Sequence, residues 1–238
     1  MATQNLLYQR KIQINPYIQV MIPSVGEILE DEDGYYGLIS MFTAMPIDMM
    51  VQLDDIGIDF TSINEWELFL LVFNGLRSQD TRLVLGDLDL SQFKIAVNEQ
   101  NGNVVLLDEA RDIMIDREIH ARIAGTLRKI HHLQKDRRSP GNEEAKQYMI
   151  ERARKKLRRS KNRVSDSQLE TLIVAMVNTE QYKYDFESTR ALSIYQFNEC
   201  VQQIINKVDY EHRMHGVYAG TISTKDLSQE DLNWLRHK

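Results

Sequence analysis

The chain has few of the residues that cross-link or interrupt a fold. Its 238 residues include one cysteine, four prolines and eleven glycines. Cys200 alone excludes a disulfide within the chain, and its helical context in residues 195–208 indicates a small packed side chain in a reducing compartment. No run of 18 apolar residues is present, and the first residues lack the apolar core of a signal peptide. We therefore expect a protein that is neither exported nor membrane-spanning.

Motifs for catalysis and metal binding are missing as well. We find no Gly-x-Ser-x-Gly, no glycine loop that cradles phosphate, and no base placed to activate a nucleophile. His131 and His132 would point about 100° apart on a helix, and His212 with His215 has no further ligand at zinc spacing. The acidic segment 30–34 lacks the spacing of a calcium loop. We expect no enzyme activity, no metal site and no cofactor.

Charge is distributed unevenly along this acidic chain. The net charge is −13 over residues 1–120, +11 over residues 121–163 and −4 over residues 164–238. One basic segment thus lies between two acidic ones. Docking of these segments within the chain, or between copies of it, competes with any outside anion as a partner.

The N-terminal part combines a short strand or hairpin with helices. Apolar residues alternate from Ile12 to Ile22, with an interruption at Pro16 and an end at Pro23. Helical patterns follow over 35–44, from Pro46, and over 64–75, where Ser62 or Asn64 can cap the helix and Gly75 can end it.

A small antiparallel sheet is predicted next. The apolar runs 93–97 and 104–107 flank Asn101-Gly102, a dipeptide that favours a tight hairpin turn, and residues 107–115 can add a third strand. Asp116 can cap a helix with apolar positions through Leu133 that stops before Ser139-Pro140-Gly141.

That tripeptide divides the predicted architecture. The fold class is mainly α (α+β): an α+β domain over residues 1–138, with its hairpin near 92–115, and a helical region over residues 139–238 that begins with a long basic helix. Helical patterns follow the basic helix, and Ser228 with Asp231 forms a capping-box pattern for a short final helix.

The basic segment ERARKKLRRSKNR, residues 151–163, has three interpretations. Asn142 can cap a helix with acidic residues in its first turn and basic residues at its far end, and the seam 145, 148, 149, 153 and 157 would lay this charged helix on the body. The cations can instead bind phosphates, although no stacking aromatics lie among them. Finally, they can bind an acidic protein surface, including another copy of this chain.

If the chain binds a protein partner, a small set of side chains is predicted to make the contact. The predicted contacts lie on the long helix, with one aromatic anchor in the C-terminal segment. They are Tyr148, Met149, Arg152, Lys155, Lys156, Arg159 and Trp234. The ten methionines, including Met41, Met45, Met49 and Met50, suit either a surface that repacks around a client or the gaps of the core.

Several stretches resemble proteins encoded in the tail-morphogenesis region of phages and prophages of Gram-positive bacteria, similar to tail assembly chaperones. The likeness extends from Ile12 to Leu235. The stretches are INPYIQVMIPSVGEILE, LDDIGIDF, WELFLLVF, the basic segment, SQLETLIVAMVNTEQYKYDF and HGVYAGTISTKDLSQEDLNWL. The hairpin at Asn101-Gly102 and the long basic helix depart from the compact chaperones.

The resemblance implies a non-enzymatic factor that binds tape-measure or tail-tube proteins in the host bacterial cytoplasm. Two other functions stay open. One is a structural tail or connector component retained in the virion, where copies of the chain can form a homo-oligomer. The other is a nucleic-acid-binding regulator that uses the basic helix. No membrane partner is expected.

Overall fold

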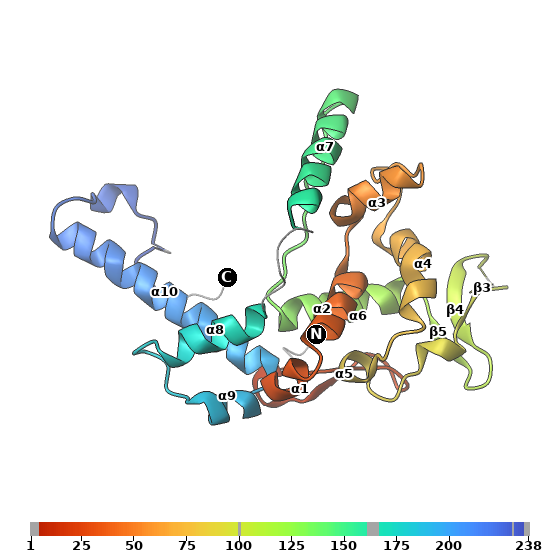
Figure 1. Cartoon of the computed structure of the whole chain (residues 1–238), viewed down its shortest axis with the longest axis horizontal. Coiled ribbons are helices and arrows are strands. Elements are labelled where there is room, and N and C mark those ends of the chain that lie inside the picture. The colour runs from red at the N-terminus through yellow and green to blue at the C-terminus, as the bar shows by residue number, and fades with distance from the viewer. Residues whose placement is uncertain (1–4, 100, 161–166, 230, 236–238) are drawn as a thin grey trace.

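The computed structural model describes residues 5–99, 101–160, 167–229 and 231–235. It confirms a mainly helical α+β fold with two small antiparallel sheets. Figure 1 shows the helices around a central body, from which α7 (Glu143–Ser160) rises and α10 (Ile194–Tyr218) extends to one side. Among the described residues, no helix is both long enough and apolar enough to cross a membrane.

The N-terminal alternation forms a hairpin. After η1 (Leu6–Tyr8), β1 (Lys11–Gln13) pairs antiparallel with β2 (Gln19–Met21), with Ile12 opposite Val20. Ile12, Val20 and Ile22 are buried, which is why the alternation appears in the sequence. The hairpin leads into α1 (Val25–Leu29), which Ser24 and Glu27 begin with a reciprocal capping box.

Helices then build most of the N-terminal core. They are α2 (Glu32–Thr43), η2 (Pro46–Met49), α3 (Met50–Asp55), α4 (Glu65–Leu76), α5 (Arg82–Leu85) and η3 (Leu90–Gln92). Asn64 caps α4 as predicted, accepting from the backbone N–H groups of Trp66 and Glu67. Gly75 does not end this helix, because α4 continues to Leu76 and Arg77 closes it in a right-handed conformation.

The second sheet confirms the predicted hairpin and its third strand. β3 (Lys94–Val97) pairs with β4 (Val104–Asp108), and β4 pairs with β5 (Ile113–Ile115), both antiparallel. Gly102 adopts a φ of +70°, the left-handed turn conformation that glycine tolerates best.

Helix α6 (Arg117–Ile130) begins where predicted but ends earlier. Asp116 accepts from the N–H of Ile119 and caps it. The helix stops nine residues before Ser139 because His131 and His132 close it, the latter with a φ of +54°. Leu133 therefore lies in the connection to α7 rather than on a helix.

The C-terminal region contains α8 (Gln168–Val177), α9 (Phe186–Ala191), α10 and η4 (Thr224–Asp226). Residues 161–166, between α7 and α8, lie outside the described residues. The prediction of a short final helix is wrong for the residues that are described. The N–H of Ser228 donates to the Asp231 carboxylate and the N–H of Asp231 donates to the Ser228 hydroxyl, but only turns follow. A capping box stabilises only the first turn of a helix. Further turns need a buried apolar face, and this segment has none among its described residues.

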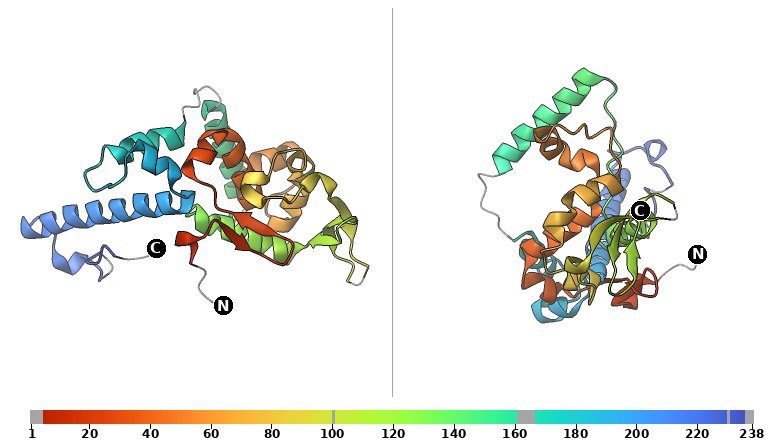
Figure 2. Two further views of the ribbon diagram at one scale, coloured as in Figure 1. Left: turned by 90° about the horizontal axis from the view of Figure 1, so that it is seen from below. Right: turned by 90° about the vertical axis from the view of Figure 1, so that its right-hand side faces the viewer.

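The two parts of the chain share one hydrophobic core. Phe42, Phe73, Leu127 and Phe197 belong to the same buried cluster, although they come from both sides of residue 139. The backbone also joins them, since the N–H of Val25 donates to the carbonyl of Leu192 at 2.9 Å. Figure 2 shows α10 and the β3–β4 hairpin extending from opposite ends of this joint body.

Candidate partner-binding surface

The basic helix α7 is anchored to the body near its middle. Asn142 caps it, accepting from the N–H of Ala145 at 2.8 Å. Ile150 is only 5% exposed and packs with Ile47, Leu53 and Phe60 in a second hydrophobic cluster beneath the helix. Burial of this single β-branched side chain fixes which face of α7 meets α3.

Ion pairs reinforce the same face. Lys146 Nζ lies 2.8 Å from Asp59 Oδ2, and Arg154 lies 2.8 Å from Asp54 and 2.6 Å from Asp55. The hydrogen bond from Lys146 lowers the pKa of Asp59 to about 2. The basic helix thus docks on the acidic LDDIGIDF segment of its own chain, one of the partners that the charge distribution predicted.

The seam differs from the one predicted by about one residue. Lys146, Ile150 and Arg154 are spaced four apart and face the body, together with the half-buried Met149. Tyr148 is instead 64% exposed, and Leu157 is exposed too. The prediction omitted Ile150. Its position four residues from both Lys146 and Arg154 could have indicated it, because the long side chains of lysine and arginine can cover an apolar residue between them.

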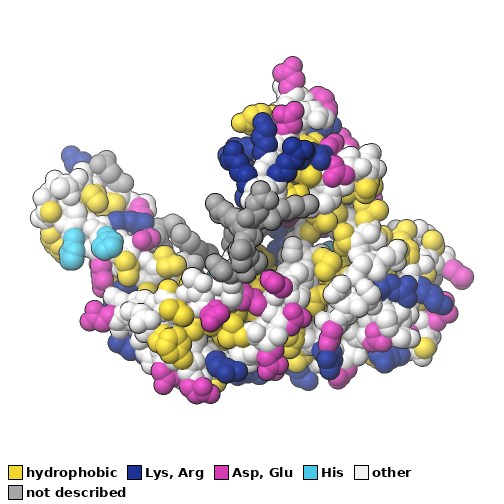
Figure 3. Space-filling view, in the orientation of Figure 1, with side chains coloured by type: hydrophobic (Ala, Val, Ile, Leu, Met, Phe, Trp, Pro, Cys, Tyr) yellow, Lys and Arg dark blue, Asp and Glu magenta, His cyan; other side chains and the backbone are white. Residues whose placement is uncertain are grey.

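The remaining predicted contacts on α7 face solvent. Arg152, Lys155, Lys156 and Arg159 are exposed, and no ion pair within 4.0 Å joins them to another residue in the described part of the chain. Figure 3 shows Lys and Arg side chains gathered over the middle of α7, with acidic side chains at its upper end. Trp234 lies in the C-terminal turns, 37% exposed, and is not on this helix.

An apolar groove opens between α2, η2 and the connection from α6 to α7. Its volume is about 560 Å³, and three of the predicted methionines, Met41, Met45 and Met49, line it with Tyr36 and Leu133. We call it the methionine groove. All three methionines are half-buried, so each presents part of a flexible thioether side chain at the groove wall.

Arg128 holds the elements around the methionine groove in place. Its Nη2 donates to the carbonyl of Thr43 at 2.6 Å and to Glu65 at 3.0 Å, and it lies 3.8 Å from the sulfur of Met45. Lys135 reaches the same carboxylate at 2.5 Å. Burial acts to raise the pKa of Glu65, but the two cations outweigh it and the pKa lies below its usual range. This clamp joins α2, α4, α6 and the α6–α7 connection, and no sequence pattern predicted it.

The connection is fastened on its other side by two histidines. His131 Nε2 lies 2.9 Å from the hydroxyl of Tyr35, and burial lowers the pKa of His131 to about 4. His132 Nε2 lies 3.4 Å from Glu199 on α10. The two rings serve different contacts, as their adjacent positions predicted, and within the described ranges no cluster of His, Cys, Asp and Glu fits a metal ion.

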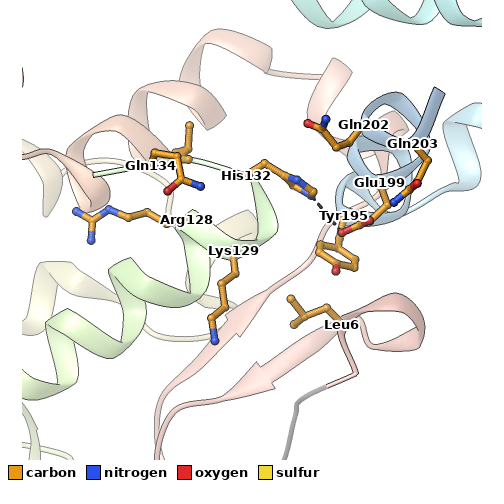
Figure 4. A pocket seen from close by; sticks show the side chains of 10 residues that line it. Leu6, Arg128, Lys129, His132, Gln134, Tyr195, Glu199, Gln202 and Gln203 are labelled. Atoms are coloured by element: carbon orange, nitrogen blue, oxygen red, sulfur yellow. Dashed lines mark ion pairs between the residues drawn. The ribbon is translucent and has the colours of Figure 1, made fainter. Parts of the chain in front are cut away.

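A second groove lies across the connection from the methionine groove. It measures about 550 Å³ and has a polar wall, with Lys129, Glu199, Gln202 and Gln203 (Figure 4). Arg128, Leu133 and Gln134 line both grooves. The α6–α7 connection therefore separates the apolar methionine groove from the polar second groove.

Residues 159–238 match the family described as the YomV second domain. This family is associated with phages and prophages, so the match supports a relation to phage proteins. It covers the last third of the chain, including α8, α9 and α10, and leaves most of α7 and the whole N-terminal part outside. No curated protein and no solved structure matches the chain.

Proposed function

We propose that the protein is a non-enzymatic phage tail assembly factor that binds an amphipathic segment of a tape-measure or tail-tube protein in the methionine groove. The observation that carries the proposal is the groove itself, an open apolar surface of about 560 Å³ lined by Met41, Met45 and Met49. The relation of residues 159–238 to a phage-associated family supports the biological setting.

The chemistry of the methionine groove suits a helical client. Unbranched thioether side chains adapt to irregular apolar surfaces, and helices commonly bind in grooves through residues spaced three and four apart. A client that is still unassembled exposes such a face. Its burial in the groove would prevent the client from associating with itself.

Helix α7 contributes selection by charge. Arg152, Lys155, Lys156 and Arg159 project from the exposed face of a helix that is already held by Ile150. Cations at the rim of an interface speed association and favour partners with acidic flanks more than they add affinity. The proposed client is therefore apolar on one face and acidic beside it.

The direct test measures binding of the protein to phage tail-tube and tape-measure proteins. The variant Met41→Gln/Met49→Gln keeps side-chain length but places amides in the methionine groove. We expect it to weaken binding about tenfold or more, since two apolar contacts are lost. The matched control is Leu71→Gln/Val174→Gln, which changes two exposed residues outside the groove. Equal affinity for both variants would contradict the proposal.

The charge on α7 needs a separate pair of variants. Reversal of Arg152, Lys155, Lys156 and Arg159 to Glu should lower the association rate at low salt and have less effect at high salt. Reversal of four exposed cations elsewhere, Lys11, Arg122, Lys183 and Lys225, is the control for net charge. If the association rate changed equally in both variants, the cations of α7 would have no specific role in binding.

Two other functions predict different results. Stoichiometric copies of the protein in purified particles would indicate a retained structural component. A salt-dependent mobility shift of short DNA duplexes, abolished by replacing Lys155, Lys156, Arg158 and Arg159 with Ala, would indicate a nucleic-acid-binding regulator.

A further inference from the structure

Strand β3 forms an open edge of the second sheet. The strand order is β3-β4-β5, so only one side of β3 is paired in the described part of the chain. Its side chains Ile95 and Val97 are 50% and 62% exposed. In Figure 1 the strand lies at the outer end of the body, far from α7 and α10. An exposed apolar edge of this kind readily pairs with another strand.

The hydrogen-bond pattern fixes which backbone groups point outward. Asn98 lies opposite Asn103 in the extended register, and its N–H donates to the Asn103 carbonyl at 2.8 Å. Hydrogen-bonded pairs alternate along an antiparallel ladder, so Ala96 and Lys94 also bond toward β4. Ile95 and Val97 therefore direct their N–H and C=O groups away from β4.

This pattern is complementary to itself. If two copies of β3 meet antiparallel with Ile95 opposite Val97 of the second copy, each pair can exchange two backbone hydrogen bonds. The symmetric arrangement makes four such bonds from two strands of four residues. A slip by one residue would place outward groups of one strand against inward groups of the other and would also reverse the faces.

Side chains and charges agree with the same register. Val97 lies opposite Val104 within the hairpin, on the face that carries Ile95, so pairing joins the exposed apolar residues of both copies into one band. Lys94 would lie opposite Asn98 of the second copy. The two Lys94 side chains would then be about 13 Å apart along the strands, at 3.3 Å per residue.

We propose that two copies of this chain associate through β3, with Ile95 of each copy opposite Val97 of the other. The result is a continuous six-stranded sheet with an isologous interface. Because each strand contributes only four residues, the dimer is reversible and depends on protein concentration. It leaves the methionine groove and α7 of both copies open, so the inference stands apart from the proposed function.

Sedimentation velocity of the full chain over a concentration series tests this dimer. The native chain should shift from monomer to dimer as concentration rises. Ile95→Lys/Val97→Lys places like charges opposite each other in both pairs, and we expect it to weaken the dimer about tenfold or more. Ile95→Lys/Val97→Glu also removes both apolar side chains, but it places opposite charges together and should retain more dimer than the double lysine variant.

Three results would overturn the proposal. A native chain that stays monomeric at every concentration would exclude self-association. A dimer that survives the double lysine variant, with circular dichroism unchanged, would place the interface elsewhere. Equal weakening by the two double variants would contradict the register, because this register places like charges opposite each other in the first variant and opposite charges together in the second.

Discussion

At the scale of single residues, Ile150 determines how α7 is held. On the same face of the helix Met149 is only half-buried, and Lys146 and Arg154 form ion pairs, which contribute little free energy at a solvated surface. We expect Ile150→Ala to lower the free energy that docks α7 by about 2–4 kcal/mol, the usual cost of removing a buried isoleucine side chain. Hydrogen exchange of the α7 amides measures the effect.

Tyr148 supplies the control for that substitution. It is two residues away on the same helix and is 64% exposed. Tyr148→Ala should therefore leave the protection of α7 nearly unchanged. If both variants lost protection equally, the buried contact of Ile150 would not be what holds α7.

Two histidines, the buried His120 and the half-buried His131, make stability depend on pH. Burial lowers the pKa values of His120 and His131 to about 4, against 6.5 for an exposed imidazole. The unfolded chain therefore takes up protons as the pH falls below about 6.5, before the folded chain can do so. The free energy of unfolding should decrease by about 3 kcal/mol for each histidine by pH 4.

Urea denaturation between pH 7 and pH 4.5 separates the histidines from the carboxylates, which protonate mostly below this range. His131→Phe should lower stability at pH 7, because the contact with Tyr35 is lost, but should also reduce the slope with pH. His215→Phe, at an exposed position on α10, is the control. A slope that His131→Phe leaves unchanged would refute this assignment.

At the scale of elements, glycines provide a matched pair of substitutions. Gly102 has a φ of +70° in the β3–β4 turn, whereas Gly125 lies within α6 with nothing within 4 Å of an added Cβ. Gly102→Ala should destabilise the protein by about 1 kcal/mol through backbone strain. Gly125→Ala should stabilise it by about 0.5–1 kcal/mol. Thermal denaturation distinguishes the two, and a loss of stability in both would contradict this explanation.

Most elements could be predicted because their signals are local. Alternation around Val20, the Asn101-Gly102 turn and the cap at Asp116 each identify an element from a few neighbouring residues. Helix ends were less predictable. The early end of α6 depends on contacts of His131 and His132 with distant helices, and no local pattern reports these.

The candidate site could be predicted only in part. The basic face of α7 and the relevance of Met41, Met45 and Met49 follow from composition and spacing. The methionine groove does not, because it requires the Arg128 clamp between segments that are 63 and 85 residues apart. Such pairing has no signature along the chain.

At the scale of the whole molecule, the two predicted parts should not fold separately. The division at residue 139 stays a prediction. Residues from both sides of it form one core, in which Phe197 and Ile194 are buried with residues of the N-terminal helices. We expect residues 1–158 alone to lack cooperative unfolding, since removal of α8–α10 exposes that core. The full chain should unfold in a single calorimetric transition. A fragment that melts cooperatively near the temperature of the full chain would establish an independent domain.

The crossing of residues 23–25 by residues 192–194 has a consequence during synthesis. Pro23 accepts a hydrogen bond from Ile194 at 2.8 Å, and Val25 donates to Leu192. A nascent chain emerges from the ribosome with its N-terminus first, so residues 23–25 must wait for most of the polypeptide to be translated before these partners arrive. Until then the carbonyl of Pro23 and the N–H of Val25 lack the hydrogen bonds that tie the two ends of the chain together.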